Sequence, residues 1–120
     1  MYAIIETGGK QFYVEQGMVL DVPLMAAEPL ASITFDKVLL CSNGSEVAVG
    51  TPHVPDAVVK ASCVGEAKAA KLTVFKMRRR KASMCKTGHR QKHTRVKILD
   101  IKAPIAPRAV APAAPAAPEA

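Results

Sequence analysis

Three side chains able to bind zinc recur at intervals of four residues in this 120-residue sequence: Cys85, His89 and His93. Thiolate and imidazole groups are usual zinc ligands, and this spacing would place all three on one face of a helix. No fourth ligand lies nearby, and the surrounding positive charge opposes a dication. No acidic residue is available to orient Cys85 and His89 as a nucleophile and its base. We therefore expect no metal, no cofactor and no enzymatic activity.

Positive charge dominates the same region. The stretch from Lys76 to Lys97 has no acidic residue and ten basic ones: Lys76, Arg78, Arg79, Arg80, Lys81, Lys86, Arg90, Lys92, Arg95 and Lys97. Residues 1–66 have three basic residues against eight acidic ones, a net charge of −5, so the overall charge of +7 conceals an acidic body with a cationic arm. A surface that is merely solvated, the simplest alternative, normally mixes both signs because a run of one sign repels itself. The pattern indicates a polyanionic partner, and nucleic acid is the obvious one.

The side chains within this stretch favour RNA over DNA. The guanidinium groups of residues 78–80 can bind phosphate oxygens in pairs and can stack on bases. In Gly88-His89-Arg90-Gln91, the glycine permits close approach to a sugar-phosphate backbone, the imidazole can stack, and the amide can contact a base edge or a 2′-hydroxyl. A simple turn is the alternative interpretation of these four residues. Recognition of duplex DNA usually requires a helix or ribbon in the major groove, and no basic helix is expected here.

A second candidate for phosphate contact is Gly8-Gly9-Lys10-Gln11. It fails as a Walker A loop because Ile4 stands where glycine is needed and Gln11 stands where Ser or Thr is needed. A strand is expected to follow it, where a Walker A loop needs a helix. Its simplest role is a hairpin turn, and contact of Lys10, Gln11 and the backbone amides with RNA phosphate is a possible second role.

Short β-strands are expected to position these groups. Residues 2–6 and 10–15 form apolar runs on either side of Gly8-Gly9, which is a hairpin signal. Residues 18–24 alternate in polarity, and Pro23 favours a position at a sheet edge. Further strands are expected at residues 34–41, 46–49, 57–64, 72–77 and 94–101. No convincing amphipathic helix is found, so the pattern predicts an all-β fold, a small antiparallel β-barrel.

The basic stretch is expected to form a long loop, residues 77–93, that projects from this barrel. Residues 57–64 and 72–77 are expected to pair as one hairpin before the loop, and residues 94–101 to follow it with Val96, Ile98 and Ile101 pointing inward. A loop of this length without structure of its own is usually functional. We expect it to be mobile in the free protein and ordered on its partner.

Composition divides the chain into a domain and a tail. Residues 1–102 are long enough for one domain with a modest core. Residues 103–120 contain five Pro and nine Ala, and are expected to form an extended, polyproline-like tail. Cysteines 41, 63 and 85 are an odd number without a CxxC pair, which argues against a disulfide framework. No targeting leader or membrane-length apolar run is found, so we expect a cytosolic protein without membrane contact.

In these motifs the sequence resembles the family of large-subunit ribosomal protein twenty-one of bacteria and organelles. The opening MYAIIETGGKQ is similar to the first hairpin of that family. The run RRRK, six residues, GHRQ, two residues and Thr94 match the spacing of its signature. The resemblance covers residues 1–102, although Ala82–Cys85 stand where the family commonly carries a Tyr and an Arg, and Lys92 stands where an aromatic residue is common.

The resemblance implies a small β-barrel whose long loop inserts into large-subunit ribosomal RNA, assisted by a neighbouring protein, large-subunit ribosomal protein twenty. We therefore expect a structural constituent of the large ribosomal subunit in the cytoplasm, with no small-molecule substrate and no homo-oligomer. A general nucleic-acid-binding protein of the nucleoid type, without a unique site, is the alternative. The expected RNA contacts are Lys76, Arg78, Arg79, Arg80, Lys81, Lys86, Gly88, His89, Arg90, Gln91, Lys92, Thr94 and Arg95, with Lys10 and Gln11.

Overall fold

The computed structural model describes residues 1–104, which contain ten β-strands and no helix, so the expected all-β class is confirmed. In this part of the chain there is accordingly no helix long and apolar enough to cross a membrane. The strands are β1 (Tyr2–Thr7), β2 (Lys10–Glu15), β3 (Val19–Pro23), β4 (Ser32–Phe35), β5 (Val38–Ser42), β6 (Val47–Val49), β7 (Val58–Lys68), β8 (Leu72–Arg78), β9 (Ser83–His89) and β10 (Lys92–Lys102).

Eight strands form two antiparallel four-stranded sheets, in the orders β2-β1-β5-β6 and β3-β10-β7-β4. The expectation of a closed barrel was wrong, because among residues 1–104 the strands are not hydrogen-bonded into one ring. The edge strands β4 and β6 are only four and three residues long, so they offer few backbone groups for pairing with the other sheet. The expected hairpin at Gly8-Gly9 and the edge position of β3, which ends at Pro23, are both confirmed.

The core lies between these two sheets. One sheet contributes Ala3, Ile5, Val14, Val38 and Cys41, and the other contributes Val22, Ile33, Phe35, Val59, Ala61, Cys63, Val96, Ile98 and Ile101. Val96, Ile98 and Ile101 point inward as expected. The three-residue step from Ile98 to Ile101 follows from a register shift in β10 that leaves Leu99 half exposed.

The pairing of the second half of the chain differs from the expectation. Residues 57–64 do not form a hairpin with residues 72–77: β7 pairs with β10 along almost its whole length, and β8 pairs with β9. The apolar alternation of β7 and β10 explains this, because each strand buries one face in the same core. The two strands then continue beyond the core and carry β8 and β9 between them.

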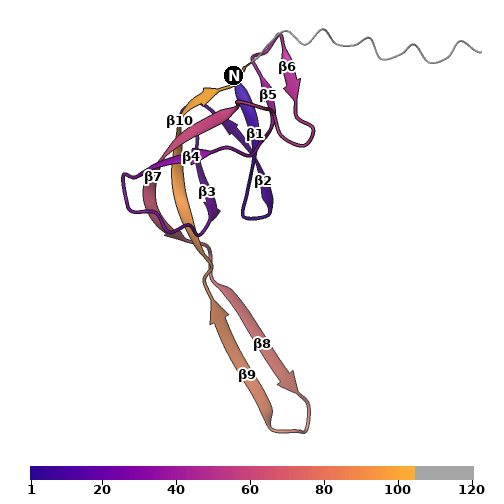
Figure 1. The fold of residues 1–120 in the computed structure, drawn as a ribbon. Coiled ribbons are helices and arrows are strands. Elements are labelled where there is room, and N and C mark those ends of the chain that lie inside the picture. The colour runs from indigo at the N-terminus through magenta and orange to yellow at the C-terminus, as the bar shows by residue number, and fades with distance from the viewer. Residues whose placement is uncertain (105–120) are drawn as a thin grey trace, which may run out of the picture.

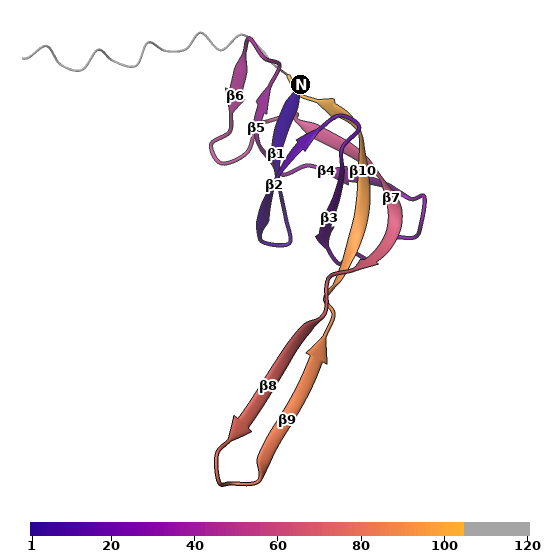
Figure 2. The ribbon, with the colours of Figure 1, turned by 180° about the vertical axis from the view of Figure 1, so that it is seen from behind.

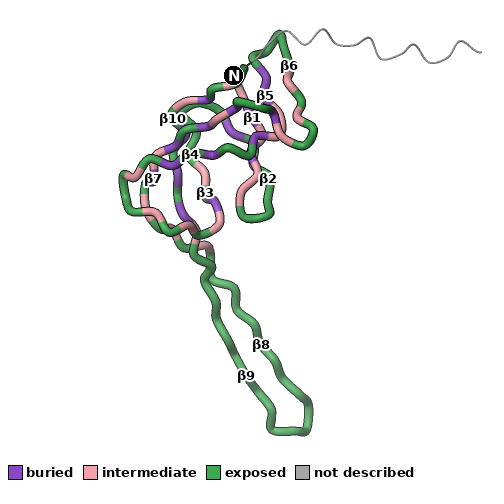
Figure 3. The backbone as a smooth tube through the Cα atoms, viewed as in Figure 1, coloured by how far each residue is buried: buried purple, intermediate pink, exposed green. Residues whose placement is uncertain are grey.

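The strands β8 and β9 form a third, two-stranded sheet that projects from the end of β7 and β10, away from the other eight strands (Figures 1 and 2). Residues 72–89 are all exposed, in contrast to the purple core positions of the two larger sheets (Figure 3). We call β8, β9 and their turn the long hairpin, residues 68–71 and 90–92 the neck, and residues 1–67 and 93–104 the body. The expected tail, residues 103–120, lies outside the described residues except for Ala103 and Pro104.

Candidate nucleic-acid interface

The basic stretch forms a regular antiparallel hairpin. Its register runs from Leu72 opposite His89 to Arg78 opposite Ser83. The expectation of an irregular loop at residues 77–93 was therefore wrong, because most of these residues lie in β9 or at the start of β10. A two-stranded ribbon that is exposed on both faces is at best marginally stable by itself in water. Its length and exposure indicate a surface that a partner covers.

The alternation of the two strands gives the long hairpin two different faces. One face carries Leu72, Val74, Lys76 and Arg78 of β8 with Ser83, Cys85, Thr87 and His89 of β9. The other face carries Thr73, Phe75 and Met77 of β8 with Met84, Lys86 and Gly88 of β9. Side chains of Phe75, Met77 and Met84 are 55%, 62% and 71% exposed, so this second face presents an apolar strip next to positive charge.

Four residues, Arg79 to Ala82, close the hairpin at its far end. Two of them have left-handed backbones, with φ of 63° at Arg80 and 45° at Ala82. This conformation is unfavourable for residues other than glycine, and such strain often marks functional sites. Arg79, Arg80 and Lys81 lie in this turn and Arg78 ends β8, so four exposed cations are adjacent in the chain, as expected of a phosphate-binding element.

Backbone hydrogen bonds and the Arg90 side chain join the two strands at the neck. The Ala69 N–H donates to the Gln91 carbonyl at 2.8 Å. The Arg90 guanidinium donates through Nε to the Ala69 carbonyl at 2.9 Å and through Nη2 to the Lys68 carbonyl at 3.5 Å. His89 Nε2 and Gln91 Oε1 lie 2.9 Å apart. Two of the expected RNA contacts, Arg90 and Gln91, therefore also hold the neck together.

The neck also holds two basic residues that the expected set of contacts omits. Lys68 lies directly opposite Lys92 in the β7–β10 register. A Cβ atom at Gly88 would lie 2.3 Å from Lys71 Cε, so the flexible Lys71 side chain lies directly over the Gly88 backbone. The signal for both residues is present in the sequence, since the acid-free window extends back to residue 67.

Thr94 and Arg95 have intramolecular partners. Thr94 is 1% exposed; its Oγ1 accepts the Met25 N–H at 2.9 Å and its hydroxyl donates to the Met25 carbonyl at 3.4 Å. Its side chain belongs to the core, so its place among the RNA contacts is not supported. Arg95 donates to Asp21 Oδ1 at 2.7 Å and to Oδ2 at 3.0 Å, from β10 to β3. This hydrogen-bonded pair lowers the pKa of Asp21 and raises that of Arg95.

The turn of the first hairpin lies near the neck. A Cβ atom at Gly8, whose φ is +57°, would lie 2.6 Å from Pro23 Cγ, so the turn packs directly against Pro23. Pro23 in turn is the β3 partner of His93, the second residue of β10. Lys10 and Gln11 are exposed beside this turn. The two segments that the sequence identified as phosphate contacts thus lie at the same end of the body.

The helical arrangement that would unite Cys85, His89 and His93 is not formed. Cys85 and His89 lie in a strand, where four residues span about 13 Å, and His93 lies beyond the neck. Within residues 1–104 no group of three or more His, Cys, Asp or Glu side chains is placed to hold a metal ion. The thiol of Cys85 instead lies 3.5 Å from Thr87 Oγ1 on the exposed hairpin.

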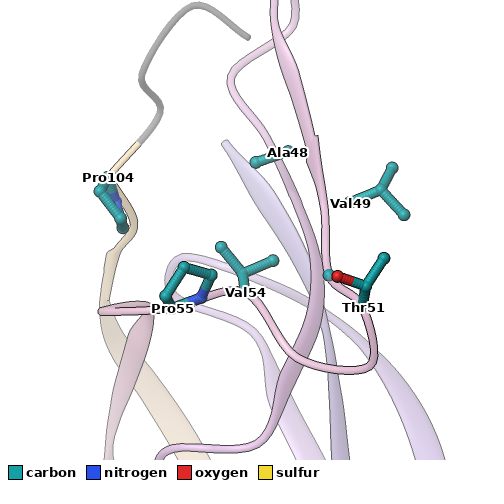
Figure 4. Close-up of a pocket in the computed structure, with 7 residues that line it drawn as sticks. Ala48, Val49, Thr51, Val54, Pro55 and Pro104 are labelled. Carbon is teal, nitrogen blue, oxygen red and sulfur yellow. The ribbon is translucent and has the colours of Figure 1, made fainter.

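A hollow of about 320 Å³ lies near the other end of the body, where β6 and the end of β10 approach each other (Figure 4). It is lined by Ala48, Val49, Gly50, Thr51, Val54, Pro55 and Pro104. None of these side chains is ionisable, so the hollow has neither an acid–base group nor a charge for a polyanion. The cationic surface of the neck and long hairpin is the better candidate site.

Several bacterial proteins are similar to this chain in sequence. The sequence model of the family described as "Ribosomal prokaryotic L21 protein" matches residues 1–101. "Large ribosomal subunit protein bL21" of Maridesulfovibrio salexigens is 50% identical over 103 residues, which are 86% of this chain and all of that protein. The protein of the same name from Gloeobacter violaceus is 48% identical over 101 residues, which are 84% of this chain. The one from Chloroflexus aggregans is 45% identical over 103 residues, which are 86% of this chain. The match covers 84% of the Gloeobacter protein and all of the Chloroflexus protein.

Proposed function

Because this chain belongs to the ribosomal prokaryotic L21 protein family, whose members are proteins of the large ribosomal subunit and not enzymes, we propose that its long hairpin and neck bind large-subunit ribosomal RNA. One observation carries this proposal. Between Lys68 and Lys92 the structure displays ten Lys and Arg residues and no acidic residue on a ribbon without a core of its own. Bacterial ribosomes lie in the cytoplasm, so this is also the proposed location.

The hairpin acts as a cationic rod between RNA segments. Each seven-residue strand extends about 24 Å, which is long enough to separate two crowded phosphate backbones. Lys and Arg side chains along the rod replace the counterions of both backbones, so segments that would otherwise repel each other can approach. Arg90 joins the two strands of the neck, Lys10 extends the cationic surface onto the body, and Gln11 adds a polar side chain beside it.

The body is suited to a different neighbour. The body has six basic and nine acidic residues, a net charge of −3, which disfavours contact with RNA and favours a basic protein. The loop between β3 and β4 displays two apolar side chains, Leu24 at 51% and Leu30 at 86% exposure, and Leu30 has a φ of 67°. We propose that this surface contacts a neighbouring large-subunit protein, and the family resemblance implies large-subunit ribosomal protein twenty.

The alternative function is that of a general nucleic-acid-binding protein without a unique site, since positive charge alone would also attract bulk DNA or RNA. Sedimentation of a native bacterial lysate on a sucrose gradient separates the two. At high magnesium the chain is expected with intact ribosomes, and at low magnesium with the large subunit only, even after a high-salt wash. If it sediments near the top or with bulk nucleic acid, the ribosomal function is excluded in favour of the alternative.

A further inference from the structure

The tip of the long hairpin is hollowed. A depression of about 270 Å³ is lined by Met77, Arg78, Arg79, Arg80, Ala82, Ser83 and Met84. At about 30 Å³ per molecule of liquid water, it has room for roughly nine waters. This is enough for one planar heterocyclic ring system with part of its hydration. The left-handed backbones of Arg80 and Ala82 shape the turn beside this open depression.

The lining combines apolar side chains, here called the floor, with cationic side chains, here called the rim. Met77 and Met84 lie directly opposite each other on β8 and β9, so their thioether side chains share one face at the base of the turn. Polarisable sulfur makes favourable contacts with aromatic rings. The rim residues are Arg78, which lies on the opposite face of the hairpin from the methionines, and Arg79 and Arg80 of the turn. A guanidinium plane can stack on a ring as well as bind a phosphate. Phe75 is next along the same face as Met77 and is 55% exposed.

We propose that this tip hollow binds one unstacked nucleobase of the ribosomal RNA, with the phosphates of the same nucleotide on the arginine rim. The proposal rests on the proposed function and adds a base-specific contact to it. A site for phosphate alone would have no use for the exposed pair Met77 and Met84. A protein segment would need to carry acidic groups to match four adjacent cations, Arg78 to Lys81. A flipped-out nucleotide satisfies both halves of the lining, with an apolar ring face and an anionic backbone.

The exposed thiol of Cys85 provides a site for a chemical label that can test this proposal. Cys85 is exposed whereas Cys41 and Cys63 are buried, so a thiol-reactive iron chelate can be attached at Cys85 alone. Cys85 lies on the opposite face of the hairpin from Met77 and Met84. In large subunits reconstituted with the labelled full-length chain, hydroxyl radicals from the iron then cut the RNA near the tip. The cleavage sites identify the RNA segment that lies beside the hairpin tip. Base reactivity toward dimethyl sulfate and carbodiimide is compared in that segment with and without the chain.

Two double variants separate the apolar floor from the overall fold of the hairpin. Met77→Gln/Met84→Gln keeps the length of both side chains and makes the floor polar, whereas Met77→Leu/Met84→Leu keeps it apolar. Val74→Ala is the matched control, because it truncates an apolar residue on the other face of the hairpin. All three variants retain Cys85 and the four basic residues of the tip.

One base in the cleaved segment is expected to be protected with the wild type, the Leu variant and Val74→Ala, and exposed with the Gln variant. Backbone protection is expected to persist in all of them, with RNA affinity of the Gln variant reduced about fivefold or more, the lower limit for one stacked base. Protection that persists in the Gln variant, is lost in the Leu variant, or occurs at no base would overturn the proposal. If the iron cuts large-subunit RNA nowhere, the proposed function itself fails.

Discussion

Lys68 and Lys92 lie directly opposite each other on β7 and β10, at the point where these strands leave the body. Like charges at directly opposed positions of an antiparallel pair are destabilising. The free protein therefore has two like charges at opposed positions of the neck, and a phosphate bound beside them would offset their repulsion. The arrangement indicates that the neck is adapted to the bound state.

Substitution Lys68→Glu is expected to raise the thermal stability of the free protein and to weaken RNA binding. The introduced carboxylate attracts Lys92 where an ammonium group repelled it, and a gain on the order of 1–4 °C in Tm is expected. RNA affinity is expected to fall because a phosphate site becomes anionic. Calorimetry and filter binding measure the two effects. Lys102→Glu, which makes the same change at the far end of β10, is the control and is expected to leave RNA affinity nearly unchanged.

Replacement of Arg78, Arg79 and Arg80 by Ala is expected to weaken RNA binding without unfolding the body, because all three residues are exposed. Each lost phosphate contact should reduce the slope of log affinity against log salt by about 0.7–0.9. Binding titrations at several salt concentrations measure this slope. An unfolded triple variant, or one with an unchanged slope, would show that these arginines serve the fold and not the RNA.

Removal of the Asp21 carboxylate is expected to tighten RNA binding. In the free protein Arg95 donates two hydrogen bonds to Asp21, so Asp21→Asn frees its guanidinium for a phosphate near the neck. Affinity should rise severalfold, and the salt slope should steepen by up to about 0.9. Asp36→Asn removes the same charge from an exposed position between β4 and β5 and controls for net charge. Equal effects of the two substitutions would mean that Arg95 makes no phosphate contact.

The Asp21–Arg95 pair also predicts a limited pH dependence of stability. Because Arg95 lowers the pKa of Asp21 below its ordinary value of 3.8, the pair stabilises the fold above that pH. This stability is lost as the pH falls through the lowered pKa. Arg95→Gln is expected to reduce Tm slightly at pH 7, since the pair is exposed, and not at all near pH 2. A deficit of the same size at both pH values would point to lost packing.

Substitution Thr94→Val is expected to destabilise the fold by about 1 kcal/mol, because it leaves partly buried backbone groups of Met25 without their partner. Thr94→Ser keeps the hydroxyl and is expected to lose much less. Denaturant unfolding of both variants measures the difference. RNA affinity of the folded Val variant should match that of the wild type. A loss of RNA affinity in the folded variant would show that Thr94 contacts the RNA.

Elements with a strong local signal were predictable from the sequence. The Gly8-Gly9 turn, the edge strand ending at Pro23 and the inward residues of β10 all follow from glycine and proline chemistry and from alternation. The pairing of β7 with β10 was not predictable from adjacent runs, because it joins segments about thirty residues apart through a shared core. The absence of a closed barrel was not predictable either, because closure depends on the lengths of the edge strands, and alternation alone does not determine these lengths.

For the site, the sequence identified the cationic stretch but only part of its conformation. The strand expected at residues 72–77 is present as β8, whereas β9 was missed because Lys86 and Gly88 interrupt the apolar alternation of residues 83–89. The roles of Thr94 and Arg95 depend on Met25 and Asp21, which lie 69 and 74 residues earlier in the chain. Contacts over such separations have no local signal.

The long hairpin also leaves both of its outer edges without a strand partner among residues 1–104. Exposed edges with apolar residues such as Phe75 and Met77 are templates for pairing with a second chain and for aggregation. Flanking Lys and Arg residues oppose this, because two such ribbons repel each other. The same charges would thus act as gatekeepers that keep newly made chains apart until RNA covers them. Neutralising them should carry a cost in solubility even where no RNA is present.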